Sequence, residues 1–87
     1  MFYIITERPR EIGERLLKNL EAGVTYLQGK GGFTGKDKEI VFCAVHGPQG
    51  PQVEEIVKEE DPSAFMIVTS ASEIYGEGYK DLFADVL

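Results

Sequence analysis

The chain has 87 residues, of which 43% are hydrophobic, and its formal net charge is −6. This length fits one domain with a marginal core, for which oligomerisation is a common remedy. The acidic balance argues against a general binder of nucleic acid or of anionic membranes. The single cysteine, Cys43, excludes an internal disulfide framework. It lies inside an apolar run, which is typical of a buried thiol and fits a reducing cytoplasm.

No targeting or membrane-spanning segment stands out. The apolar residues 1–5 are too few for the central region of a signal peptide. No other segment approaches the roughly 18 apolar residues that a spanning helix needs. We therefore expect a soluble piece, whether isolated or part of a longer protein.

The first third of the chain predicts a strand at residues 2–6 followed by a helix. Thr6 is a candidate N-cap, and Pro9 suits the first turn, where a missing N–H costs little. Gly13 lowers helix propensity, and close packing of the helix on a sheet would explain it. Gly23 is a candidate C-terminal glycine. Apolar residues recur at helical spacing at Ile12, Leu16, Leu17 and Leu20.

The remaining elements are predicted from alternation, turn residues and apolar spacing. They are strands at residues 24–28, 39–46 and 64–70, a helix at 51–60 ended by Asp61 and Pro62, and a tail at 71–87 with a turn at 76–78 and a short helix at 81–87. The order β-α-β-β-α-β predicts an α+β fold of the ferredoxin-like type, an antiparallel sheet with both helices on one face. We expect residues 1–87 to form one such domain, with 71–87 as its C-terminal tail.

The predicted strands carry apolar residues on both faces. In residues 39–46, Val41, Cys43 and Val45 point one way, while Ile40, Phe42 and Ala44 point the other. Tyr3 and Ile5 likewise oppose Phe2 and Ile4, and Phe65 and Ile67 oppose Met66 and Val68. Two helices cover only one face, so the other must meet another chain, another domain or the tail. We favour a homo-oligomer, either a dimer or a trimer.

The connection between the second and third strands concentrates glycine and lysine. Glycine lets a ligand approach the backbone, and successive exposed N–H groups can form an anion-binding nest. Thr34 could donate a hydroxyl hydrogen bond and the lysines could supply charge. The alternative is a long hairpin connection with glycines at its bends. The candidate ligand-binding residues here are Gly29, Lys30, Gly31, Gly32, Phe33, Thr34, Gly35, Lys36 and Lys38.

This segment is not one of the common phosphate-binding loops. Alignment of a Walker A loop on Gly35 and Lys36 puts Lys30 at the first glycine and Asp37 at the hydroxyl position. A dinucleotide fingerprint aligned on Gly29 and Gly31 needs glycine at Thr34, and no helix follows. ATP hydrolysis by a P-loop mechanism is therefore not expected.

A second glycine cluster lies in the tail, where two tyrosines flank a tight turn. Such tyrosines could stack on a base or ring of a ligand held by the first loop, or simply pack on the sheet. The candidate residues are Tyr75, Gly76, Glu77, Gly78 and Tyr79.

Three stretches together resemble the soluble C-terminal domain of the YitT-type bacterial membrane proteins, a domain of unknown function. They are the glycine loop at residues 29–35, the Asp-Pro-Ser-Ala-Phe run at 61–65 and the Ser-Glu-Ile-Tyr-Gly-Glu-Gly-Tyr run at 72–79. The resemblance covers essentially the whole chain. It implies that several transmembrane helices precede this domain and that it lies on the cytoplasmic side of the membrane.

The strand order and the Gly31-Gly32-Phe33 segment are also similar to the PII signalling proteins and to PII-like receptors for cyclic di-adenylate. Those proteins are trimers that bind adenine nucleotides at subunit clefts. The loop here is much shorter than the PII T-loop, which argues against partner regulation by such a loop and leaves binding of a small ligand open.

The sequence gives little support for a catalytic or metal-binding site. His46 is the only histidine and ends a predicted strand, so we expect no catalytic or zinc site there, with contact to a ligand as the alternative role. An acidic run is predicted to be the solvated face of the second helix, with weak binding of a divalent cation as the alternative. That run comprises Glu54, Glu55, Glu59, Glu60 and Asp61.

We expect a non-enzymatic sensor domain that binds a small anionic ligand, with an adenine nucleotide as the leading candidate, at a subunit cleft near the glycine loop. No cofactor, metal or nucleic acid is expected. The alternative is a homo-oligomerisation module of the membrane protein that binds no small molecule.

Overall fold

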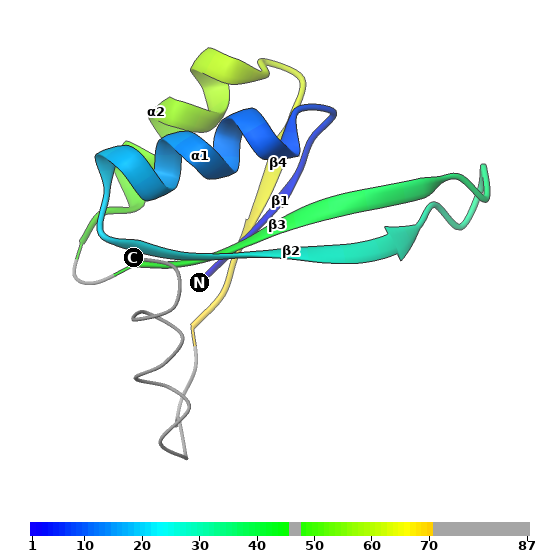
Figure 1. The fold of residues 1–87 in the computed structure, drawn as a ribbon, viewed down its shortest axis with the longest axis horizontal. Helices are drawn as coiled ribbons and strands as arrows, with labels where there is room; N and C mark the ends of the chain where they lie inside the picture. The colour runs from blue at the N-terminus through cyan, green and yellow to red at the C-terminus, as the bar shows by residue number, and fades with distance from the viewer. Residues whose placement is uncertain (46–47, 71–87) are drawn as a thin grey trace.

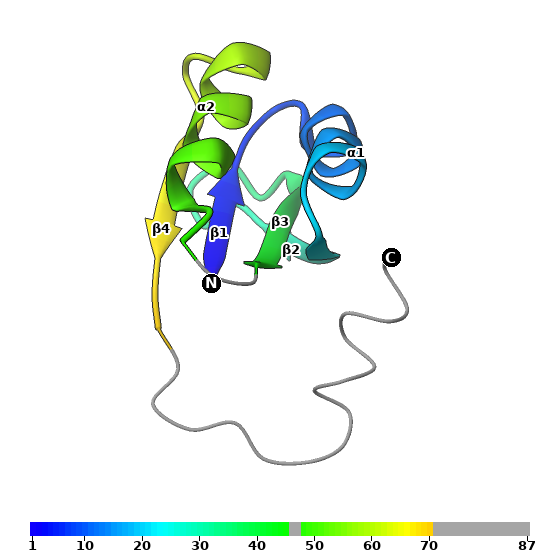
Figure 2. The same ribbon diagram turned by 90° about the vertical axis from the view of Figure 1, so that its left-hand side faces the viewer.

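Six elements make up the fold in the computed structural model, which describes residues 1–45 and 48–70. They are β1 (Phe2–Ile5), α1 (Pro9–Asn19), β2 (Ala22–Lys30), β3 (Asp37–Val45), α2 (Gly50–Glu60) and β4 (Phe65–Val68). The strands form one antiparallel sheet in the order β2-β3-β1-β4. Both helices lie on the same face of this sheet (Figure 1 and Figure 2). The predicted ferredoxin-like α+β fold is therefore confirmed.

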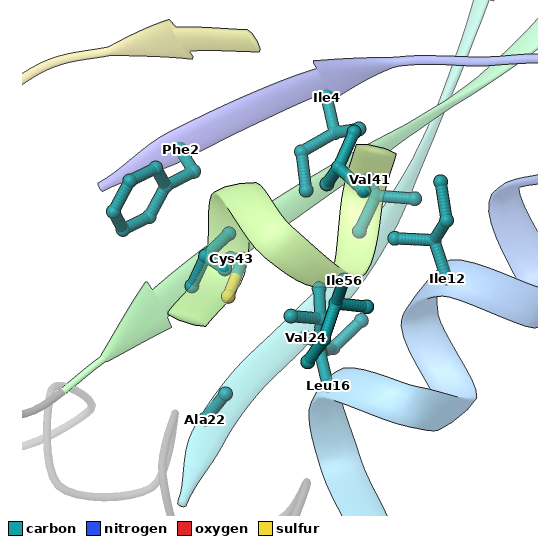
Figure 3. Packing of buried hydrophobic residues seen from close by; sticks show 11 residues of the cluster. Phe2, Ile4, Ile12, Leu16, Ala22, Val24, Val41, Cys43 and Ile56 are labelled. Carbon is teal, nitrogen blue, oxygen red and sulfur yellow. The ribbon is translucent and has the colours of Figure 1, made fainter. Parts of the chain in front are cut away.

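The core lies between the sheet and the two helices (Figure 3). Ile4, Val41 and Cys43 of the central strands are fully buried. Their partners from the helices are Ile12, Leu16, Val53, Ile56 and Val57. Burial raises the pKa of the Cys43 thiol to about 12, so this thiol is inert at neutral pH, as expected of a core cysteine.

The strand register confirms the predicted alternation of the two faces. Tyr3 lies opposite Phe42 on one side and Ile67 on the other, and Ile5 lies opposite Ile40 and Phe65. We call the side of the sheet away from the helices the helix-free face. Its apolar side chains are Tyr3, Ile5, Leu27, Ile40, Phe42, Ala44, Phe65 and Ile67.

Part of the helix-free face is open to solvent in the described structure. Phe65 is 58% exposed, Ile67 is 49% exposed and Leu27 is 38% exposed. Tyr3 and Phe42 are half-buried against each other, with their ring centroids 5.1 Å apart. An apolar face of this kind normally meets another surface.

Two local predictions were wrong. Thr6 is not the N-cap, because α1 begins at Pro9 with Arg8 in the cap position. The Thr6 hydroxyl instead accepts a hydrogen bond from the N–H of Arg8, ahead of the helix. Gly23 does not end α1, because it lies in β2 opposite Ala44. The hairpin pairing that extends β2 back to Ala22 outweighs the preference of glycine for a helix end.

The β2–β3 hairpin is longer than predicted. Pairing continues through Gly29 opposite Lys38 and Lys30 opposite Asp37, so only residues 31–36 form the connecting loop. Both strands extend past the helices, and the loop stands at the end of a projecting arm (Figure 1).

Close packing of α1 on β2 explains Gly13, as expected from the sequence. Gly13 is buried, and a Cβ placed there would clash with the hydroxyl of Tyr26 and lie 2.7 Å from its Cζ. Arg10 also contacts the Tyr26 ring, with its guanidinium carbon 4.0 Å from the ring centroid.

We expect Gly13→Ala to destabilise the domain by about 1–2 kcal/mol, although alanine raises helix propensity by about 1 kcal/mol, because overpacking against Tyr26 costs more. Urea unfolding measures the difference. Tyr26→Phe removes the closest atom and should recover part of the loss in the double variant. Stabilisation by Gly13→Ala would show that α1 does not pack closely here.

Candidate functional site

The loop at the end of the hairpin is an ordered turn held by its own backbone. The Gly31 N–H donates to the Lys36 carbonyl at 2.9 Å, and the Gly35 N–H donates to the Gly31 carbonyl at 2.8 Å. Gly35 has a φ of 71°, which a residue with a Cβ rarely adopts. The Lys36 N–H donates to the Thr34 hydroxyl at 3.2 Å. These three N–H groups are thus occupied within the loop, and an anion-binding nest would have to use others.

A groove of about 590 Å³ lies between the projecting hairpin and the corner where β1 ends and β4 begins. This volume falls within the range of small-molecule sites. The groove brings Thr34, Lys36 and Lys38 of the predicted site together with residues far away in the sequence. Its other lining residues are Ile5, Thr6, Glu7, Pro9, Asp37, Glu39, Ile40, Asp61, Ser63 and Phe65.

Asp61 fixes the corner of the groove. Its carboxylate accepts hydrogen bonds from the Thr6 hydroxyl at 2.7 Å and the Glu7 N–H at 3.2 Å. It also accepts from the hydroxyl and the N–H of Ser63, at 2.8 and 3.1 Å. The β1–α1 connection and the α2–β4 connection are therefore tied to one side chain.

Asp61 corrects the prediction that the whole acidic run is a solvated helix face. It is buried, with 8% exposure, just beyond the end of α2. The hydrogen bond from Thr6, followed by that from the Ser63 hydroxyl, lowers the pKa of Asp61 to about 2. A buried carboxylate with four donors is stable as an anion.

A second acidic wall residue, Glu39, is also internally paired. Arg10 makes two bonds to its carboxylate, at 2.7 and 2.9 Å, and the Gln28 amide donates at 2.9 Å. The Arg10 bond, then the Gln28 bond, lowers the pKa of Glu39. Two of the acidic groups that line the groove are therefore compensated by neighbouring groups.

Lys36 and Lys38 make no ion pair within the ranges 1–45 and 48–70, and both remain on the groove wall. Glu7 and Asp37 line the same groove. Ile5, Ile40 and Phe65, which are cross-strand neighbours, form the apolar part of the lining, which we call the floor of the groove. The lining therefore combines cations, hydrogen-bond acceptors and an apolar surface, which suits a ligand that carries an anionic group and a ring.

The rest of the predicted site is not gathered here. Gly29 and Lys30 lie in β2, and Gly31, Gly32, Phe33 and Gly35 lie in the turn; none of these six lines the groove. The cluster Tyr75, Gly76, Glu77, Gly78 and Tyr79, the tail elements at 76–78 and 81–87, and His46 lie outside the described residues.

Sequence reasoning missed Thr6, Asp61 and Ser63 as parts of one corner. The Asp-Pro-Ser run held a usable signal, because aspartate often accepts a bond from the backbone two residues later. The contact with Thr6, 55 residues away, had no such local signal.

No helix in residues 1–45 or 48–70 is long and apolar enough to cross a membrane. Within the same residues, no group of three or more histidine, cysteine, aspartate or glutamate side chains could hold a metal ion.

The fold and groove define a small α+β domain of the ferredoxin-like type. A family described as an uncharacterized protein conserved in bacteria (DUF2179) matches residues 22–76, and the chain belongs to this family. A crystal structure of a DUF2179 protein from Eubacterium ventriosum has 35% sequence identity and a TM-score of 0.68, and the match covers 78% of this chain and 93% of that one.

The curated relatives are much longer proteins. UPF0750 membrane protein YvjA of Bacillus subtilis (strain 168) is 40% identical over 80 residues, which cover 92% of this chain and 28% of the relative. UPF0750 membrane protein YitT of the same organism is 33% identical over 78 residues, covering 90% of this chain and 28% of the relative. The chain thus spans little more than a quarter of these relatives, and the resemblance to the YitT-type family is confirmed.

We expect acid to remove the contribution of Asp61 to stability. Its pKa is lower in the folded chain than its ordinary value of 3.8, so its contribution is complete above about pH 4 and is lost as the pH falls towards 2. Asp61→Asn should lower the melting temperature by roughly 10 °C at pH 7. Thermal melts of both proteins from pH 7 to pH 2.5 should show this difference shrinking below pH 4; a constant difference would contradict the assignment.

Proposed function

We propose that this chain is the regulatory domain of a membrane protein of the UPF0750 type, on the cytoplasmic side of the membrane. In this proposal the groove binds a small anionic ligand, with an adenine nucleotide as the leading candidate. Ligand binding shifts the conformational populations of the domain and so biases the attached transmembrane region. The observation that carries the proposal is the groove itself, which joins Lys36 and Lys38 to a corner fixed by Asp61.

The groove offers partners for each part of a nucleotide. Lys36 and Lys38 supply charge for phosphate, and the Thr34 hydroxyl adds a donor. The apolar floor of Ile5 and Phe65 suits the face of a base. Glu7 provides acceptors for sugar hydroxyls. The role proposed is binding, with no reaction assigned.

The groove floor is also part of the helix-free face, because Ile5, Ile40 and Phe65 belong to both. A second copy packed on that face would border the groove. A ligand there would then contact two subunits, and binding and assembly would be thermodynamically coupled. This arrangement supports the proposed site at a subunit cleft.

We expect one member of a ligand panel to raise the melting temperature selectively. The panel is ATP, ADP, AMP, cyclic di-AMP, phosphate and sulfate at about 1 mM. A ligand at a hundred times its Kd stabilises by about 2.7 kcal/mol, which corresponds to a rise of roughly 10 °C in a domain of this size. Lys38→Gln should abolish most of the rise, whereas Lys18→Gln on α1, which does not line the groove, should keep it.

A flat response across the panel would contradict the adenine-nucleotide assignment. An equal loss in the Lys38 and Lys18 variants would show that the effect reflects overall charge and does not come from the groove.

The second candidate function is homo-oligomerisation through the helix-free face, with no small ligand. The specific observation is the exposure of Phe65 and Ile67 on that face, at 58% and 49%. An open apolar surface on a domain of this size favours assembly. The same face would then hold two or three membrane-protein subunits together.

We expect the chain to be a dimer or trimer at tens of micromolar in sedimentation velocity, and Ile67→Glu to make it a monomer because a charge would be buried at the interface. Val68→Glu is the matched control, since Val68 adjoins Ile67 on β4 but points to the opposite face and is 62% exposed. It should leave the assembly intact. A monomeric wild-type chain would contradict both the assembly and the subunit cleft.

A further inference from the structure

The tip of the β2–β3 hairpin carries an aromatic side chain with no packing role in the described part of the domain. Phe33 is fully exposed, at 102%, and lies between glycine and threonine in the turn. A single exposed apolar side chain is common on protein surfaces. This one stands in the turn at the end of an arm that projects past the helices (Figure 1).

The charge around Phe33 differs in sign from the charge of the molecule. Residues 30–38 hold three lysines against one aspartate, a local charge of +2, whereas the whole chain carries −6. Lys30, Lys36 and Lys38 form no ion pair with any side chain in residues 1–45 or 48–70. The net negative charge that argues against a general membrane binder therefore does not describe the tip of the hairpin.

The backbone of the hairpin is ordered up to the turn. Lys30 and Asp37 are opposite each other in the strand register and are the last pair of the ladder before the turn. The Gly31 and Gly35 bonds then close the turn itself. By the strand register, Lys30 and Lys38 point to opposite faces of the hairpin and so flank the turn that carries Phe33. The backbone that carries them is already ordered, which lowers the entropy cost of binding.

We propose that this hairpin tip docks onto the surface of an anionic lipid bilayer. Phe33 enters the boundary between headgroups and acyl chains, where aromatic rings are favoured. Lys30, Lys36 and Lys38 lie against the lipid phosphates, each strengthening binding by about fivefold near such a surface. The acidic body is repelled by the same surface, so the molecule approaches with its tip first.

The membrane contact can be tested separately from ligand binding in the groove. Phe33 and Lys30 do not line the groove, so variants at these two positions test the membrane contact and leave the groove lining unchanged. Lys36 and Lys38 belong to both surfaces, and a docked tip would place the open groove beside the membrane.

The chain contains no tryptophan, so Phe33→Trp introduces a single tryptophan as a fluorescent reporter at the tip. We expect its emission to shift to the blue when vesicles of phosphatidylglycerol are added up to several millimolar lipid, and to stay unchanged with phosphatidylcholine. Phe65→Trp, on the helix-free face, should show no such shift. Retained melting temperature of each variant shows that the fold is intact.

In the Phe33→Trp background, Lys30→Gln should weaken binding to phosphatidylglycerol by about fivefold. Lys18→Gln, which removes an exposed lysine from α1, should leave it within twofold. The proposal is overturned if the emission of the Phe33→Trp variant does not change with anionic vesicles, if it shifts equally with neutral vesicles, or if Phe65→Trp gives the larger shift.

Discussion

The Asp61 carboxylate connects the two chain segments that cross one end of the sheet. Thr6 and Glu7 follow β1, and Ser63 precedes β4. Four hydrogen bonds to the Asp61 side chain therefore hold the β1–α1 connection against the α2–β4 connection. Because β1 and β4 are paired neighbours, this contact also sets the geometry at the end of their ladder. The wall of the groove that faces the hairpin depends on this arrangement.

Three surfaces follow from the same topology. The helices cover one face of the sheet and leave the helix-free face apolar. The β2–β3 hairpin runs past the helices, so its lysines approach the Asp61 corner and create the groove. The end of the hairpin presents Phe33 to the surroundings. A ligand, a second copy and a bilayer are thus proposed for three adjoining surfaces. The groove shares Lys36 and Lys38 with the hairpin tip, and it shares Ile5, Ile40 and Phe65 with the helix-free face.

The sequence predicted the parts of the fold that depend on periodicity. Alternation in residues 40–45 and the apolar spacing of Ile12 and Leu16 indicated the strands, helices and their order. The sequence pattern did not predict that Gly29 and Lys38 are partners in the strand ladder. Both residue types are poor strand formers, and only the neighbouring pairs hold them there. The groove was not predictable either, since it needs Thr6 and Asp61 to meet through tertiary packing, and a lone aspartate after a helix normally faces water.

The most direct test of the proposed binding groove is a ¹H–¹⁵N NMR titration of the chain with the nucleotide that stabilises it best. If the groove is the binding site, the largest shift changes cluster at Thr34, Lys36 and Lys38 of the hairpin and at Thr6 and Ser63 of the Asp61 corner. Shift changes confined to the helices, or no shift changes at saturating ligand, would show that the groove is not the binding site.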